Sequence, residues 1–321
     1  VDEAAMVVLN PAPTYTNHNY DFGLVTSLPG QNAYCSADLA NTVAMMKKYN
    51  LITLEDLSLA SEVEGRVFVG RNLISSAGAS FGSHLAGSIA NTDNTFVVVG
   101  SLATGNPLTV QAGSARIGGN INGRTINLTG GSVVADASLS NASMTMQLQA
   151  ASTGLALLAA NNNVSTAGNI ANFNVTSVNG CGIAIFNVDA ASLFSNANVS
   201  QISLNAGSAN AIIINVTGSA VKWSSAASLA GQFADSNWRG RVLWNFHEAS
   251  SINLGGHVMM GAVLAPFAAV TTQASIEGSL AARALTSSAP VHAPEFSGDL
   301  SCACTNPAPT PNPKSPLINL N

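Results

Sequence analysis

Charged residues are scarce in this chain. Only 8% of its 321 residues are Asp, Glu, Lys or Arg, against about 25% in an average soluble protein. The 11 Lys and Arg are scattered, and the formal net charge is −5. Because phosphate binding needs a basic patch, we expect no nucleic-acid partner. A weakly charged surface also repels copies of itself only weakly.

Long apolar runs are absent as well. Hydrophobic residues make up 47% of the chain, which argues against disorder, but the longest runs, such as residues 211–216, are the length of a strand. About 20 apolar residues are needed to cross a bilayer, so we expect no membrane span. The chain begins at Val1 without a basic segment followed by an apolar one. We therefore expect an extracellular or cell-surface protein from which any signal peptide has been removed.

Cysteine occurs four times, and the spacing does not fit a zinc site. Cys302 and Cys304 form a single C-x-C pair with no second pair to complete a ligand set. Disulfides are the better explanation in an exported chain. A bond between Cys302 and Cys304 would close a strained loop, so we expect the tail to reach Cys35 and Cys181, within one subunit or between two.

From residue 49 onward the chain consists of short β-rich runs separated by glycine. Examples are residues 66–70, 95–100, 211–218 and 241–246. Regular short strands with glycine turns indicate a mainly β body. Their density, with small residues and Asn at the turns, predicts a β-solenoid that stacks rung on rung, with a β-sandwich as the alternative.

Three segments have helical character. Residues 37–48 carry apolar side chains at helical spacing, with an acidic first turn and a basic last turn. Residues 141–163 predict one long helix that flanks the solenoid, ended by the asparagines at 161–163. A short turn after residue 189 is expected, with Asp189 as its N-cap.

Both ends of the chain are rich in proline. Residues 1–34 contain three prolines and no helical period, and the last fifteen residues contain five prolines. Proline excludes helix and inner strand, so we predict two extended arms. The expected organisation is an arm with a short helix at 1–48, a β-solenoid domain at 49–296 and a proline-rich tail at 297–321.

Three motifs carry a resemblance to a known family. They are V-E-G-R-V-x-V-G at Val63 to Gly70, L-W-N-F-x-E-A at Leu243 to Ala249 and G-A-V-L-A-P at Gly261 to Pro266. In order and spacing, residues 49–296 resemble the choice-of-anchor A family of exported bacterial surface domains. The resemblance implies a β-solenoid of ice-binding-like character with a flanking helix.

The stretch at residues 241–270 contains the most chemistry-bearing side chains. An active site would need His247, Glu248 and His257 to converge on a nucleophile or metal. The order H-E followed by a distant His is not the H-E-x-x-H zinc motif. We interpret the stretch instead as two packed strands joined by a turn, with Pro266 ending the second strand.

Acidic residues concentrate at Glu55, Asp56, Glu62 and Glu64. They lack the D-x-D-x-D-G pattern of a calcium loop, so we predict no metal site and no cofactor. Three further histidines, His18, His84 and His292, lie in polar or proline-bearing company and are expected to be exposed or to cap turns. Arginines beside glycine turns, at Arg66, Arg71, Arg124 and Arg241, are expected to pair with carbonyls or carboxylates between rungs.

Two functional hypotheses follow. The first is a structural subunit that polymerises into an extracellular fibre, its only partner being copies of itself. An apolar arm would add a strand to a neighbour's open sheet edge. The arm candidates are Met6, Val7, Val8, Leu9 and Pro11 near the start, and Leu317 and Ile318 near the end.

The alternative is a monomeric adhesin on the cell surface. Its Asn- and Ser-rich face would bind polysaccharide or host matrix. Ice binding is less favoured, because the threonines do not recur at a visible rung spacing. No pair of titratable groups stands out for acid and base work, so an enzyme is not expected.

Overall fold

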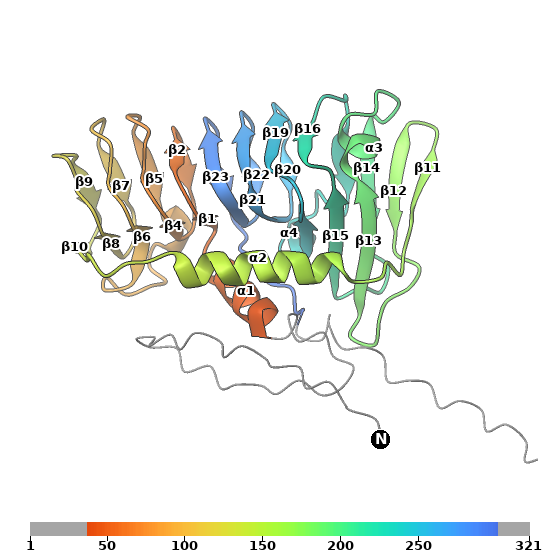
Figure 1. Cartoon of the computed structure of the whole chain (residues 1–321), viewed down its shortest axis with the longest axis horizontal. Helices are drawn as coiled ribbons and strands as arrows, with labels where there is room; N and C mark the ends of the chain where they lie inside the picture. Colours follow the sequence, from red (N-terminus) through yellow and green to blue (C-terminus); the bar gives the residue numbers. More distant parts are fainter. Residues whose placement is uncertain (1–36, 301–321) are drawn as a thin grey trace, which may run out of the picture.

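The strands of this chain stack into long parallel sheets. The computed structural model describes residues 37–300, which are mainly β with four α-helices (Figure 1). All strand pairs are parallel except the hairpin of β11 (Val164–Ala167) and β12 (Ile170–Asn174). The fold is therefore that of a β-solenoid, and the parallel pairing excludes the sandwich alternative, which is built from antiparallel sheets.

The first face of the solenoid carries its longest ladder. In spatial order its strands are β10 (Val133–Ala135), β8 (Ser114–Ile117), β6 (Asn94–Val98), β4 (Val67–Val69), β1 (Leu51–Thr53), β23 (Leu280–Ser287), β21 (Ala262–Thr272), β18 (Val242–Asn245), β15 (Ala211–Thr217) and β13 (Ile183–Asp189). Strand β15 is buried from Ala211 to Val216. A continuous apolar run is typical of a parallel strand covered on both sides.

The second face holds shorter strands in two groups. The seven-stranded group is β20 (Met259–Met260), β22 (Ile276–Glu277), β24 (Val291–His292), β3 (Glu62–Val63), β5 (Ala79–Phe81), β7 (Leu108–Val110) and β9 (Ile126–Leu128). Beyond β11 and β12, the four-stranded group contains β14 (Gln201–Asn205) and β17 (Ser228–Gly231). Their side chains alternate between buried and less buried, as expected where one side of the sheet lacks a covering layer.

A third face completes the turn. It is formed by β2 (Leu57–Leu59), β16 (Ala220–Lys222), β19 (Ser251–Gly255) and the C-terminal halves of β21 and β23. We call it the uncovered face, because its outward side chains at Lys222, Asn253, Thr271 and Thr286 are exposed.

Four α-helices accompany the strands. They are α1 (Ala37–Lys48), α2 (Ala142–Ala156), α3 (Ala190–Phe194) and α4 (Ser236–Arg239). Helix α2 runs along the solenoid and connects one end of the stack to the other (Figure 1). Helix α1 packs against it.

The structure confirms α1 and the N-cap of α3, where Asp189 accepts a hydrogen bond from the Ser192 backbone. Helix α2 is shorter than predicted and ends at Ala156. We expected the asparagines at 161–163 to end this helix. Two of them instead bind the loop after the helix to the stack through hydrogen bonds. Asn161 accepts from the backbone of Ile185 at 2.7 Å. Asn162 accepts from Thr176 at 2.8 Å.

The first and last strands of the first face, in chain order, meet in the middle of the stack. Strand β1 pairs with β4 on one side and with β23 on the other. We call this junction the seam. Buried Asn50 bridges it by donating to the backbone oxygens of Gly278 at 3.2 Å and His292 at 3.0 Å. It also accepts from the Gly65 backbone at 3.0 Å.

Ser279 joins the two ends at the seam. Its hydroxyl donates to the Met46 oxygen at the end of α1 at 2.9 Å and accepts from the Phe296 backbone at 2.8 Å. The glycine of the V-E-G-R motif also lies here. A Cβ at Gly65 would overlap Glu295 and Asn50, so this approach of the two chain ends requires glycine.

Two apolar clusters hold the fold together. One fills the interior of the solenoid, where Phe173 packs against Phe233 and Trp244. The other lies between the helices and the first face, where Leu148 and Leu155 of α2 belong to the buried set. Burying one such side chain contributes about 1.5–3 kcal/mol.

Pro266 does not end a strand, contrary to our expectation. Strand β21 runs through it from Ala262 to Thr272. The pairing with β23 shifts register between Ala265 and Ala269, where the strand passes from the first face to the third. Proline is tolerated at such an irregularity because it has no backbone N–H to contribute to the ladder. Within residues 37–300, no helix has the length and apolar character needed to cross a bilayer.

Candidate functional site

Small polar side chains form a row across the uncovered face. The strand register places Lys222 beside Asn253, and Asn253 beside Thr271. Thr271 lies beside Thr286, and Thr286 beside Ser58. Neighbouring strands are about 4.8 Å apart, so the row repeats at that interval. Such a surface presents hydroxyl, amide and ammonium groups on neighbouring strands.

The row contains one threonine pair that the spacing in the sequence does not reveal. Thr271 and Thr286 are direct neighbours in the ladder, and both are exposed. The turns of this solenoid differ in length, so the alignment cannot be recognised until the register is known. The row is short, because Ser58 and Asn253 flank the two threonines.

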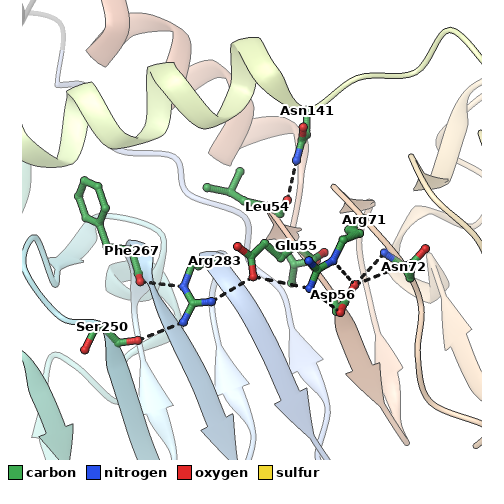
Figure 2. A network of polar contacts seen from close by, with 10 residues as sticks. Leu54, Glu55, Asp56, Arg71, Asn72, Asn141, Ser250, Phe267 and Arg283 are labelled. Atoms are coloured by element: carbon green, nitrogen blue, oxygen red, sulfur yellow. Dashed lines mark hydrogen bonds and ion pairs between the residues drawn. The ribbon is translucent and has the colours of Figure 1, made fainter.

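An ionic network lies where the first face turns into the uncovered face (Figure 2). The Arg71 guanidinium binds both carboxylate oxygens of Asp56, each at 2.7 Å. This hydrogen bond is the main reason why the pKa of Asp56 lies below its ordinary value, and it outweighs burial, which acts in the opposite direction. Asp56 also accepts from the Asn72 backbone at 3.2 Å.

The same network crosses the seam. Arg283 of β23 binds Glu55 at 3.0 Å and donates to the Phe267 oxygen at 3.0 Å and the Ser250 oxygen at 3.4 Å (Figure 2). Arg71 approaches Glu55 at 3.8 Å. Two of the four acidic residues that the sequence grouped together therefore hold the seam.

The other two acidic residues lie on the second face beside His292. Ligand atoms of Glu62, Glu64 and His292 are all within 4.8 Å of one another. The His292 Nδ1 atom lies 2.8 Å from a carboxylate oxygen of Glu277. Glu277 is bound in turn by Arg239 of α4 at 2.8 Å. No local pattern predicts that these five side chains lie together, because they come from segments that are far apart in the sequence.

Burial alone would raise the pKa of Glu277. Hydrogen bonds from Ser275 and His292, with the charges of His292 and Arg239, act against burial and lower the pKa below its ordinary value. An ionised carboxylate can only accept hydrogen bonds, so Glu277 is the acceptor toward the Ser275 hydroxyl and the His292 ring.

An asparagine ladder lies under α2. Asn187, Asn215 and Asn245 occupy matching positions of β13, β15 and β18. Asn245 donates to the Asn215 side chain at 2.9 Å, and Asn215 donates to Asn187 at 3.0 Å. Asn215 also donates to the Leu155 oxygen at 2.8 Å, and Asn245 donates to the Ser152 oxygen at 2.9 Å. The ladder fixes the C-terminal half of α2 to the first face.

Comparison with protein families finds one matching family for this chain. Residues 42–293 match the family described as "Putative Ice-binding-like adhesive domain". The chain belongs to this adhesive family. Among curated proteins, none matches it.

Two solved structures resemble this adhesive domain. One is an ice-binding protein of the Antarctic ascomycete Antarctomyces psychrotrophicus, with 15% identity, a TM-score of 0.39, and coverage of 80% of this chain and 98% of the fungal one. The other is an ice-binding protein from an Antarctic bacterium of the Flavobacteriaceae, with 12% identity, a TM-score of 0.28, and coverage of 81% of this chain and 84% of the bacterial one. At these scores the similarities say nothing further about the adhesive domain.

The family supports the adhesin hypothesis better than the fibre hypothesis, which nothing here supports. Adhesive domains of this kind are typically non-enzymatic. They act at the cell surface or outside the cell, in agreement with the expected export. Membership of the choice-of-anchor A family stays a prediction.

In the adhesive domain, residues 241–270 form strands, but four of them rather than the two that we predicted. They supply β18, β19, β20 and most of β21. Burial lowers the pKa of His247, against the opposing charge of Glu248. Glu248 accepts from the Gly218 backbone at 2.6 Å. The His257 ring stacks on Trp223 with centroids 4.7 Å apart.

Three of the four arginines pair between rungs, as expected, and Arg241 does not. Arg124 is only 4% exposed and donates to the backbone oxygens of Asn106 at 2.9 Å and Ser75 at 2.7 Å. It also binds the oxygens of Ala103 and Ala77. Arg66 approaches Asp93 at 3.7 Å, and Arg241 lies over the Trp238 ring.

Several predicted residues lie outside the described part of the adhesive domain. They are Cys35, Cys302, Cys304, His18 and the arm candidates Met6, Val7, Val8, Leu9, Pro11, Leu317 and Ile318. Cys181 is half-buried and disulfide-bonded. The disulfide pairing and the roles of the arms stay predictions.

Sequence reasoning missed the asparagine ladder, although a signal for it exists. The three asparagines follow similar apolar runs in "AIFNV", "IIINV" and "VLWNF". A recurring polar residue within strands of otherwise apolar character indicates a ladder between rungs. The cluster around His292 has no comparable local signal.

Proposed function

We propose that this chain is an extracellular adhesive module that binds polysaccharide or host matrix through the uncovered face. The observation that carries the proposal is the row from Lys222 to Ser58, in which polar side chains lie next to one another on paired strands. The first face is occupied by α1 and α2, so it cannot offer a comparable area.

The chemistry of the row suits a carbohydrate. Hydroxyl and amide groups both donate and accept hydrogen bonds, as sugar hydroxyls do. The strands beneath hold these groups in place, which lowers the entropic cost of binding. The face also exposes Ile74, which is 52% accessible and follows the Leu73 bridge to Leu57. An apolar contact next to polar ones is typical of small binding sites.

Substitution on the uncovered face tests the proposal. Thr271→Lys and Thr286→Lys point outward, so they leave the core unchanged while placing bulk and charge in the row. Binding to immobilised polysaccharides and matrix proteins is expected to fall at least about tenfold. Asn127→Lys, at an exposed position of β9 on the second face, is the control and is expected to bind normally. Equal binding by the threonine variants and the wild type would refute this face as the site.

Ice is a second candidate ligand, favoured by one observation. Thr271 and Thr286 are exposed neighbours on paired strands, an arrangement able to order water. Thermal hysteresis of the purified chain, compared with the two threonine variants, decides between ice and a polymer ligand. Hysteresis that disappears in both variants, without polymer binding by the wild type, would favour ice.

A further inference from the structure

The second face carries a cluster that the adhesive function does not use. Glu62 belongs to β3, and Glu64 directly follows the end of that strand at Val63. His292 comes from β24, which pairs with β3 across the seam. All three side chains are half-buried, so solvent reaches them.

The donor set is suited to a transition metal. Two carboxylates and one imidazole provide oxygen and nitrogen ligands of the kind that Zn²⁺ accepts. Zn²⁺ holds such atoms at about 2.1 Å. Ligand atoms that already lie within 4.8 Å of one another need only small side-chain rotations to reach one ion.

His292 is already oriented as a ligand. Its Nδ1 atom lies 2.8 Å from a carboxylate oxygen of Glu277, and in the neutral tautomer with the proton on Nδ1 the lone pair of Nε2 is free for a metal. A carboxylate on the second ring nitrogen is the usual partner of a metal-binding histidine. Glu277 does not belong to the three-residue cluster, and Arg239 and Ser275 hold it in place.

The carboxylates of Glu62 and Glu64 differ in the hydrogen bonds that they already accept. Glu64 accepts from the Ala293 backbone at 2.8 Å, which links β3 to the chain after β24. Glu62 has no hydrogen-bond partner among residues 37–300 that would compete with an ion. Three carboxylates, on Glu62, Glu64 and Glu277, face one guanidinium, on Arg239, so the local charge favours a cation.

We propose that Glu62, Glu64 and His292 form a Zn²⁺ site that ties the first and last strands of the second face together across the seam. Three protein ligands leave one position, which water fills. The ion adds a bond between segments that are more than two hundred residues apart in the sequence, so its role is to stabilise the closed solenoid.

Thermal unfolding of the full chain, stripped of metal with a chelator and then titrated with Zn²⁺, tests the site. At a hundredfold excess over the Kd, Zn²⁺ is expected to multiply the folding equilibrium constant about a hundredfold and to raise the midpoint by several degrees. Co²⁺ is expected to bind in competition with Zn²⁺ and to give visible absorption bands.

Glu62→Gln and His292→Gln are expected to abolish the shift. Glu62→Gln keeps the shape of the side chain and removes no hydrogen bond, so without metal it should unfold at the wild-type midpoint. His257→Gln, which removes a histidine that stacks on Trp223, should retain the full shift. The proposal is overturned if Zn²⁺ leaves the wild-type midpoint unchanged, if Glu62→Gln responds like the wild type, or if Ca²⁺ alone produces the shift.

Discussion

Replacing Asn215 with alanine tests how α2 is held on the solenoid. Asn215 is only 2% exposed and makes three hydrogen bonds, to Leu155, Asn187 and Asn245. A buried hydrogen bond contributes about 1 kcal/mol net. The Asn245 amide and the Leu155 oxygen retain other partners, at Ser152 and Leu158. We therefore expect the free energy of unfolding to fall by about 3 kcal/mol.

Asn187→Ala is the matched control. Asn187 lies at the exposed end of the ladder, and its other bond, to the Leu158 oxygen, is long at 3.4 Å. Its loss is expected to cost about 1 kcal/mol or less. The two variants remove the same side chain from adjacent strands. The difference between their changes in the free energy of unfolding therefore measures the effect of burying the asparagine and of its contact with α2.

Urea unfolding at 25 °C, followed by tryptophan fluorescence, measures both variants, because Trp244 precedes Asn245 in β18. For a domain of this size, 3 kcal/mol corresponds to a fall in Tm of about 6–12 °C. The reasoning is refuted if Asn215→Ala costs no more than Asn187→Ala. It is also refuted if the slope of the urea transition shows that α2 has already detached in the native state.

Other predictions concern the arginines and the arms. Arg124→Met keeps the bulk of the side chain but leaves four backbone oxygens without their donor, so we expect a loss of about 3 kcal/mol or more in the same urea assay, and a loss below 1 kcal/mol would contradict it. The lowered pKa of Asp56 means that its ion pair stabilises the fold above the ordinary pKa of about 3.9 and stops doing so as pH falls through the folded-state value. The stability difference between wild type and Asp56→Asn should therefore be at most about 1 kcal/mol at pH 7, because Arg71 is exposed, and should vanish once the pH is below the folded-state pKa. A difference that stays constant with pH would exclude the ion pair as its cause. Self-assembly through the arms stays a prediction: deletion of residues 2–13 should abolish any filaments seen by electron microscopy, and filaments formed without the arm would exclude strand donation.

The sequence predicted the local features of this fold. The short β-rich runs, the α1 segment and the Asp189 cap all depend on residues that are close in the chain. The exposed threonine pair was missed because turns of unequal length hide the register. Pro266 was misinterpreted because its effect depends on a bend within β21 that only the pairing with β23 reveals.

The candidate sites depend on one strand pairing that no local sequence pattern predicts. Strand β1 could have ended the stack, but it pairs with β23. This single pairing brings His292 to Glu62 and Glu64, and brings Arg283 to Glu55. Sequence reasoning grouped the four acidic residues by their position in the chain, whereas the fold divides them between two faces.

The position of the seam also determines how the domain responds to force. Met46 and Phe296, near the two limits of the described chain, are joined through one hydroxyl, that of Ser279, at the middle of the stack. Tension applied through the two ends would load this point and the β1–β23 pairing first, while the outer rungs on either side carry no load. An adhesive domain pulled in this way would open at its centre into two halves tethered by α2, rather than unravel one rung at a time from an end.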